Sequence, residues 1–256
     1  MAWPNSIVLV AECLLLSCLV LSVHSAVDLK KYFTCHRSDP EFNKCATKAF
    51  NDLQPILAPG IPELGFEPFD PMFIPRIEVD SFAGMTLKEV LTNVNITGLK
   101  DAKLTKADFT KLPNSIDMTW DIPFMKIKDD YTLDGVIIGM PFKGKGQGFL
   151  NCTKIRNVVK ITTELVKKDG QDYLHVKDFK YFLGTPKAAH LKFTNSLSKD
   201  NTLTEAMMKF FNDNWKVLFD TFKDFRNSGV NEAVKKGANT ILSMYPYEQM
   251  FPKTKL

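Results

Sequence analysis

The segment from Thr202 to Arg226, TLTEAMMKFFNDNWKVLFDTFKDFR, has an unusually broad apolar face. When its residues are placed about 100° apart around a helix axis, the apolar side chains fill an arc of roughly 220°. An ordinary surface helix needs a stripe only a little wider than about 100°. We therefore predict one long helix that a curved sheet wraps on more than one side. Its apolar members are Leu203, Ala206, Met207, Met208, Phe210, Phe211, Trp215, Val217, Leu218, Phe219, Phe222 and Phe225. The solvent-facing remainder is Glu205, Lys209, Asn212, Asp213, Lys216, Asp220, Lys223 and Asp224.

This helix is also the predicted floor of a cavity, because bulky aromatic side chains on one face leave gaps between them. Ligand pockets combine many apolar groups with a few polar ones that set orientation. The expected contacts are therefore apolar residues of the face with one polar anchor: Met207, Phe211, Leu218, Phe222 and Phe225, with Asn214 or Thr221 as the anchor. The alternative is that the aromatic residues are core and that both polar side chains bond nearby carbonyl groups or water.

The ends of the helix carry their own signals. Thr202 and Glu205 have capping-box spacing, and Ser228-Gly229 is a stop or a hinge because glycine accepts the left-handed conformation. Apolar residues continue at helical spacing from Val230 to Tyr245. They form a second helix or a bent continuation, and the sequence leaves both open.

The N-terminal segment has the features of a secretory signal peptide. The run from Ile7 to Val23 is almost continuously apolar, and Val23-His24-Ser25 offers small residues for cleavage. We predict a signal peptide over residues 1–25 and one ligand-binding domain over 26–256, hence a secreted, extracellular protein. A retained membrane anchor is the alternative reading of the same run.

Three cysteines follow the predicted leader. In a secreted chain we expect Cys35 and Cys45 to form a disulfide, and we expect Cys152 to be a buried thiol. Metal binding by the pair is disfavoured, because neither has a second Cys or a His at ligand spacing. Asn95 and Asn151 stand in glycosylation sequons, which act only where the Asn is exposed.

The first predicted helix starts at Asp39-Pro40-Glu41, where a capping residue precedes a proline. Pro55 and then Pro59-Gly60 are its expected end. Residues 59–75 are rich in proline and glycine but keep an apolar series. We expect an extended segment packed along the body rather than a central strand.

From Arg76 to Leu197 the apolar residues recur with a period of two, which is typical of half-buried strands. Asp169-Gly170 predicts a tight hairpin turn, and no helical pattern separates the strands, so the sheet should be antiparallel. The predicted fold class is α+β, with a strongly curved antiparallel sheet around the long C-terminal helix. The expected strand segments are 77–79, 90–99, 116–122, 136–142, 159–165, 174–183 and 191–195.

Gly144, Gly146 and Gly148 interrupt this pattern. A G-x-G-x-G run can bind phosphate, but only when a helix N-terminus follows it, and none is predicted here. Alternating glycines in a strand instead permit close backbone packing and sharp coiling. We favour this second interpretation.

The sequence lacks the usual motifs of enzymes, metal sites and nucleic-acid binding. His36, His175 and His190 have no partner at metal-ligand spacing, and Asp129-Asp130 is explained as a solvated turn. The basic residues are scattered, although the net charge is +4. We therefore expect no catalytic residues, no cofactor, no metal and no nucleic-acid partner. A hydrolase would need a Ser or Cys beside His175 or His190 in a cleft.

Several stretches together resemble the takeout/juvenile-hormone-binding protein family of insects. They are Cys35 to Cys45, Ala58 to Gly65, Phe69-Asp70-Pro71, the Gly144 to Gly148 strand and Pro246 to Pro252, in order along nearly the whole mature chain. The resemblance implies a TULIP-like fold, an internal hydrophobic tunnel and the Cys35–Cys45 disulfide. Juvenile-hormone carriers proper have a second disulfide, which Cys152 alone cannot form. The resemblance therefore favours a takeout-like member.

The function that these observations favour is a secreted carrier of a hydrophobic small molecule, such as a juvenile hormone-like terpenoid, a fatty acid or another lipid. A carrier or receptor protein is a further partner to consider. The alternative is an interaction or membrane-surface module with a solid core. A continuous apolar void of several hundred Å³ inside the fold distinguishes the two.

Overall fold

A computed structural model describes residues 29–79, 87–137, 140–194, 201–222 and 227–254. The chain divides into two units, Met1–Lys31 and Tyr32–Leu256. Of the first unit, only the start of the 3₁₀ helix η1 (Leu29–Tyr32) belongs to the described part. The predicted signal peptide lies outside it and stays a prediction. The sheet, the helices and the cavity all belong to the second unit.

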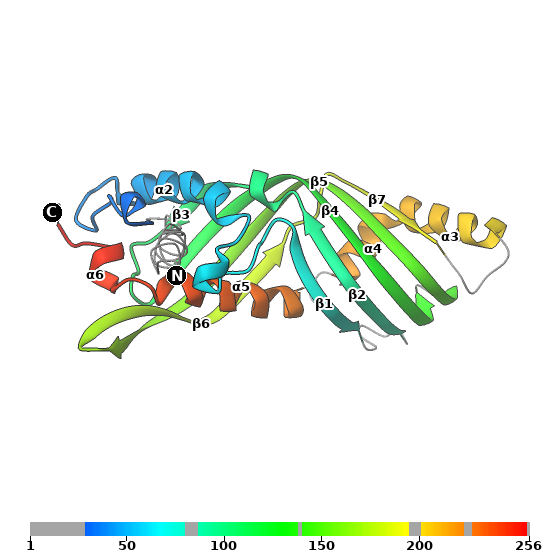
Figure 1. The fold of residues 1–256 in the computed structure, drawn as a ribbon. Helices are drawn as coiled ribbons and strands as arrows, with labels where there is room; N and C mark the ends of the chain where they lie inside the picture. Colours follow the sequence, from blue (N-terminus) through cyan, green and yellow to red (C-terminus); the bar gives the residue numbers. More distant parts are fainter. Residues whose placement is uncertain (1–28, 80–86, 138–139, 195–200, 223–226, 255–256) are drawn as a thin grey trace, which may run out of the picture. The chain divides into compact units, whose positions relative to one another are not determined.

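The second unit is built on one antiparallel sheet, with seven strands among the described residues. They are β1 (Met72–Val79), β2 (Leu87–Thr97), β3 (Lys103–Asp108), β4 (Ser115–Ile137), β5 (Met140–Lys168), β6 (Gln171–Leu183) and β7 (Ala188–Phe193). The long β4–β5 pair is the spine, and each of its strands changes partner along its length. β4 pairs with β3 and then β2, while β5 pairs with β7 and then β6 (Figure 1). The sheet therefore curls around a concave apolar face, which confirms the predicted α+β fold.

The inward-facing positions change parity along the spine, which a strict period of two does not predict. On β4, Ile122 and Met125 are both buried, with Pro123 between them. On β5, Cys152 and Ile155 are both buried, and Lys154 between them has a positive φ of 51°. The strand pairing stays in register on both sides of this point. Both strands thus rotate together, and apolar side chains stay on the concave face.

The helices differ from the single long rod that the sequence predicts. They are α2 (Phe42–Leu57), α3 (Asn201–Asp213), α4 (Trp215–Phe222), α5 (Asn227–Leu242) and α6 (Tyr247–Met250), with the short 3₁₀ turns η2 (Pro62–Leu64) and η3 (Leu99–Asp101). The rod is divided between α3 and α4 at Asn214, although the N–H groups of Asn214 and Leu218 still donate to the carbonyl oxygens of Phe210 and Asn214 at 3.0 and 3.2 Å. The Asn214 side-chain Nδ2 also donates to the Phe210 carbonyl oxygen, at 2.8 Å. A side chain that competes for a helical carbonyl distorts the helix locally.

Two further details of this region correct the prediction. Ser228 and Gly229 lie inside α5, so they are not a stop. Val217 is 57% exposed, so the wrapped face is narrower than the predicted arc. Residues 223–226, on which the choice between a second helix and a bent continuation depends, lie outside the described part.

Asparagine side chains on three helices bind the outer edges of the sheet. Asn51 of α2 accepts from the Leu104 N–H and donates to its carbonyl, both at 2.9 Å. Asn212 of α3 makes the same pair with Leu191 at 2.8 Å, and Asn239 of α5 makes it with Val176 at 2.7 and 3.2 Å. These three residues belong to β3, β7 and β6, each of which has one neighbour among the described strands of the sheet. The helices therefore cover edges that would otherwise present unpaired backbone groups. Asn212, which the sequence assigns to the solvent-facing stripe, is one of these contacts.

The N-terminal elements agree with the prediction in kind but differ in detail. Helix α2 begins at Phe42 and ends at Leu57, so Pro55 lies inside it and does not end it. Pro75 lies within β1, which is an edge strand and therefore tolerates proline. β3 was not predicted. The Asp169-Gly170 hairpin is confirmed, with φ of 51° and 77°.

Cys35 and Cys45 form the expected disulfide, which joins the segment before α2 to the helix itself. Cys152 is fully buried on β5. Among the described residues, no helix is both long enough and apolar enough to cross a bilayer.

Candidate ligand-binding cavity

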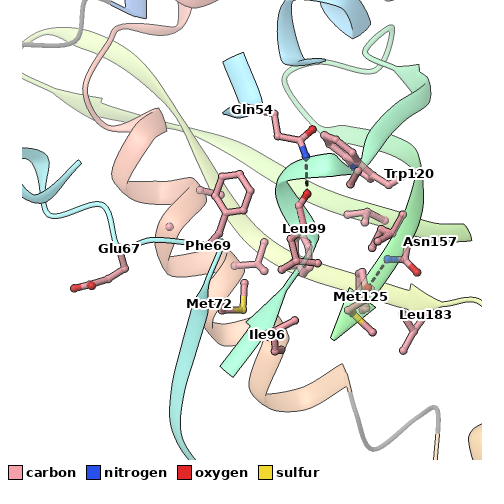
Figure 2. A pocket seen from close by; sticks show the side chains of 18 of the residues that line it. Gln54, Glu67, Phe69, Met72, Ile96, Leu99, Trp120, Met125, Asn157 and Leu183 are labelled. Carbon is pink, nitrogen blue, oxygen red and sulfur yellow. Dashed lines mark hydrogen bonds between the residues drawn. The ribbon is translucent and has the colours of Figure 1, made fainter. Parts of the chain in front are cut away.

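A cavity of about 900 Å³ lies between the concave face of the sheet and helices α2, α4 and α5. Its wall is predominantly apolar. Figure 2 shows part of it, where Phe69, Met72, Ile96, Met125 and Leu183 converge from β1, β2, β4, β6 and the segment before β1. Because β4 and β5 each contribute inward residues along their length, the cavity follows the spine of the sheet. Its wall includes members of three buried apolar clusters, for example Ile161, Met125 and Phe193.

Two amides lie on the wall near Trp120. Gln54 of α2 donates from Nε2 to the Leu99 carbonyl oxygen at 2.7 Å, and Asn157 of β5 donates from Nδ2 to the Tyr181 hydroxyl (Figure 2). Their oxygens, Gln54 Oε1 and Asn157 Oδ1, are buried without a hydrogen-bond partner among the described residues. These contacts fix the two side chains in orientation within an otherwise apolar wall.

The rim of the cavity carries opposite charges. Glu67 and Lys236 line it and are exposed, and the Glu67 side chain points away from the apolar side chains in Figure 2. Gly237 of α5 lies against the Phe66 ring, and a Cβ at this glycine would be 3.3 Å from the ring. The loop from Gly65 to Pro68 and the helix α5 therefore approach closely at this rim.

A ring of aromatic side chains lines the part of the cavity next to α3. Phe142, Phe193 and Phe211 contact one another edge to face, with ring centroids 5.7 to 6.0 Å apart. Tyr131 joins them, 6.0 Å from Phe193, and its hydroxyl donates to the Thr194 carbonyl oxygen at 2.7 Å. Such pairs stabilise beyond the area that they bury.

The alternating glycines of β5 make room for these side chains. A Cβ at Gly144 would be 2.8 Å from the Phe142 ring, and one at Gly148 would be 2.5 Å from Asp129 Oδ1. At Gly146 a Cβ would collide with the Thr194 carbonyl oxygen. All three positions permit the close packing that the sequence indicated. No phosphate-binding helix N-terminus follows the strand, because β5 continues to Lys168.

Two carboxyl groups line the cavity in the same region. Glu89 of β2 has a pKa raised to about 7, first by burial and then by the charge of Asp129. Asp129 of β4 has a pKa raised to about 6, by burial and by Asp130. The pKa of Tyr131 rises to about 12 through burial and both carboxylates. Carboxyl groups with raised pKa values in a cavity mark a candidate functional position.

The predicted ligand contacts fall into three groups. Phe211 and Leu218 line the cavity. Met207 is buried beside them in the core, and Asn214 is half-buried and bonded to Phe210; neither is among the lining residues. Residue Phe225 and the side chains of Thr221 and Phe222 lie outside the described part. About half of the wall comes from strands, which the sequence reading did not assign to the site. The sequence signal for these strand residues was the alternation that places every second side chain of a strand on the concave face of the sheet.

The remaining predicted positions are dispersed. Asn95 is half-buried on β2, and Asn151 is exposed on β5, so the second sequon is the more accessible. No group of His, Cys, Asp and Glu that would hold a metal ion occurs in the described ranges. Asp129-Asp130, interpreted above as a turn, lies in the middle of β4 instead.

Comparison with known proteins shows the family to which this chain is related. The model of the family described as haemolymph juvenile hormone binding protein (JHBP) matches residues 13–252. The circadian clock-controlled protein daywake of Drosophila yakuba is 23% identical over 202 residues, which are 75% of this chain and 77% of that protein. A Schistocerca gregaria protein named "Putative beta-carotene-binding protein" is 28% identical over 160 residues, 60% of this chain and 63% of that protein.

The fold has a counterpart among solved structures. Takeout 1 of Epiphyas postvittana superposes with a TM-score of 0.78 at 23% identity, over 86% of this chain and 99% of that one. This likeness concerns the fold. With the family model matching nearly the full length, the chain belongs to the haemolymph juvenile hormone binding protein family.

Proposed function

We propose that this protein is a secreted carrier that binds a hydrophobic small molecule in the cavity between the sheet and the helices. The observation that carries the proposal is the apolar cavity of about 900 Å³. Ligand sites are usually apolar clefts of about 300–1,000 Å³ with few polar groups. A solid-core interaction module would have no reason to keep such a space open.

Burial of apolar surface drives the binding. Each Å² of apolar ligand surface removed from water contributes roughly 25 cal/mol, less the entropy lost on association. The β-carotene in the name of the Schistocerca gregaria relative, and the hormone in the name of the family, are both largely apolar molecules. They support a terpenoid, a fatty-acid-like molecule or another lipid as the ligand class.

Secretion rests on the predicted signal peptide and is supported by the Cys35–Cys45 disulfide, since such bonds persist in oxidising compartments. The ligand contacts that we propose are Phe211 and Leu218 from the helices, with Leu150 and Ala189 from the sheet. The role is that of a binding protein and uses no catalytic residue or cofactor.

Two adjacent alanines of β7 provide a matched test. Ala189 lines the cavity, whereas Ala188 is exposed on the outer face. We expect Ala189→Phe to lower the affinity for a fluorescent apolar probe about tenfold or more, and Ala188→Phe to leave it unchanged. Native mass spectrometry of protein from its source tissue should also detect a bound lipid. Equal affinities of the two variants, together with a uniformly empty protein, would refute the carrier function.

A further inference from the structure

Glu89 and Asp129 introduce two carboxyl groups into a wall that is otherwise apolar. Glu89 is half-buried and lines the cavity, and its carboxyl group has no hydrogen bond or ion pair to any residue in the described ranges. Asp129 Oδ1 is buried and also has no hydrogen-bond partner there. A buried polar group without a partner costs free energy that a folded protein normally avoids.

In the described part of the chain, no ion pair joins either carboxyl group to a basic side chain. Tyr131 also lines the cavity, and its hydroxyl donates to the Thr194 carbonyl oxygen. On β5, the residues opposite Leu133, Tyr131 and Asp129 are Gly144, Gly146 and Gly148. Strand β7 and helix α3 contribute Phe193 and Phe211. Asp130, the next residue on β4, accepts hydrogen bonds from Asn93 and Gln147. Two other charged residues line the cavity, the basic Lys236 and the acidic Glu67, and both are exposed at the rim.

The position of the two carboxyl groups within the cavity sets the orientation that we expect for a ligand. Glu89 lies opposite Leu133, which belongs to the same buried cluster as Phe142, Phe193 and Phe211. Asp129 lies opposite Gly148, whose partner on the other side is Phe193. The remaining wall, through Met125, Ile96 and Phe69, is apolar. A chain-like ligand would therefore place its hydrocarbon along the spine and one end beside the carboxyl groups.

We propose that Glu89 and Asp129 form a polar subsite that binds the hydrogen-bond-donating head, a hydroxyl or an amine, of an otherwise apolar ligand, and that disfavours a carboxylate head. This inference rests on the proposed carrier function. A hydroxyl or ammonium group donates to the unpartnered carboxyl oxygens, and a protonated carboxyl group donates in return to a hydroxyl oxygen. A ligand carboxylate would instead be repelled by the ionised pair in a poorly hydrated space.

The raised pKa values agree with this chemistry. With pKa values of about 7 and about 6, the pair is ionised at pH 8 and partly protonated near pH 6. An amine is therefore bound more tightly at pH 8, as an ion pair, whereas discrimination against a carboxylate weakens as the pair becomes protonated.

The test uses three ligands with the same hydrocarbon chain: hexadecan-1-ol, hexadecylamine and hexadecanoic acid. Each competes with a fluorescent apolar probe at pH 8, below its aggregation concentration. We expect the alcohol and the amine to bind the wild-type protein about tenfold more tightly than the acid, which corresponds to one added hydrogen bond.

The variant Glu89→Gln/Asp129→Asn keeps the side-chain shapes and removes both charges. It should reduce the tenfold preference to less than about threefold, with each ligand affinity calculated from the probe affinity measured for that variant. Glu67→Gln, at the exposed rim, is the matched control and should retain the preference. Glu89→Gln alone, with an intermediate loss, serves if the double variant does not fold.

The outcomes separate the two proposals. Equal binding of the three ligands to the wild-type protein, or a preference that survives in the double variant, overturns the subsite but leaves the carrier function intact. Failure of the probe and of all three ligands to bind overturns the carrier function, and the subsite with it.

Discussion

Asn239 of α5 binds both backbone groups of Val176 on β6: its Oδ1 accepts from the N–H at 2.7 Å, and its Nδ2 donates to the carbonyl oxygen at 3.2 Å. The same two-bond contact joins Asn212 to Leu191 and Asn51 to Leu104. In each case a helix supplies one amide to a strand that has one neighbour among the described strands of the sheet. These contacts hold the helices over the open sides of the curled sheet, and the cavity lies in the space that remains.

Asn239→Asp tests this contact. The carboxylate keeps the acceptor for the Val176 N–H but loses the donor, and it places a negative oxygen against the Val176 carbonyl. We expect a loss of about 2–3 kcal/mol in the free energy of unfolding, because a half-buried acceptor is left unpaired. Urea denaturation measures it. Asn114→Asp, at an exposed position, is the control and should change stability by less than about 0.5 kcal/mol.

The glycines of β5 differ in what a methyl group would meet. At Gly146 the obstacle is the Thr194 backbone carbonyl, whereas at Gly148 it is the end of the Asp129 side chain. A side chain can move more easily than a paired backbone. We therefore predict that Gly146→Ala destabilises the fold by about 3 kcal/mol and Gly148→Ala by about 1 kcal/mol, at the two ends of the usual range for overpacking. Thermal unfolding of both variants gives the comparison, and equal losses would contradict it.

The sequence predicted the class of fold because the period of two over residues 76–197 and the broad apolar face of residues 202–226 are both local patterns. It could not predict where β4 and β5 change parity, because that depends on a paired rotation at Pro123 and Lys154. It also predicted the separate segments 116–122 and 136–142, although β4 runs unbroken from Ser115 to Ile137.

The candidate site was less accessible to sequence reasoning. The helix face was visible as a pattern, and Phe211 and Leu218 from it line the cavity. Glu89 and Asp129 were not singled out as a pair, because they reach the wall of one cavity only when β2 and β4 pair antiparallel. In this register Glu89 lies opposite Leu133, four residues along β4 from Asp129. Asn212 was assigned to solvent because a polar residue beside an apolar arc gives no sign that a strand edge lies opposite it.

The carboxyl pair predicts an unusual pH dependence of stability. The pKa of Glu89 is about 7 in the folded protein and near 4.5 when unfolded. Its favourable contribution is therefore fully present below about pH 4.5 and is lost as the pH rises to about 7, because the folded state resists ionisation. This direction is opposite to that of Asp121, whose pKa is lowered by the hydrogen bond from Arg156.

Glu89→Gln isolates this effect. The free energy of unfolding of the variant minus that of the wild-type protein should increase by up to about 3 kcal/mol between pH 4 and pH 8. Urea denaturation at several pH values measures the gain, and Glu67→Gln at the rim controls for the change in net charge. A difference between Glu89→Gln and the wild-type protein that stays constant from pH 4 to pH 8 would contradict the buried, unpaired carboxyl group.

The disulfide closes a short segment, since Cys35 and Cys45 are separated by 10 residues in sequence. Cross-linking a loop of this size lowers the entropy of the unfolded chain and stabilises the fold by about 2–3 kcal/mol. We predict that the double variant Cys35→Ala/Cys45→Ala loses this amount and keeps its probe affinity, although Cys35 lines one end of the cavity. Unfolding in urea and a probe titration measure the two quantities on the same sample.

Met207 and Phe211 are one helical turn apart on α3 and are equally buried, at 7% and 8% exposure, yet only Phe211 lines the cavity. Replacing either with alanine should destabilise the fold by about 2–5 kcal/mol, because each removes a large buried side chain. Only Phe211→Ala should also change ligand binding, since it widens the cavity and removes an aromatic contact. We expect a several-fold change in probe affinity for Phe211→Ala and none for Met207→Ala, each measured where the variant is fully folded. If both variants change the affinity equally, the probe responds to stability, and Phe211 does not contact the ligand.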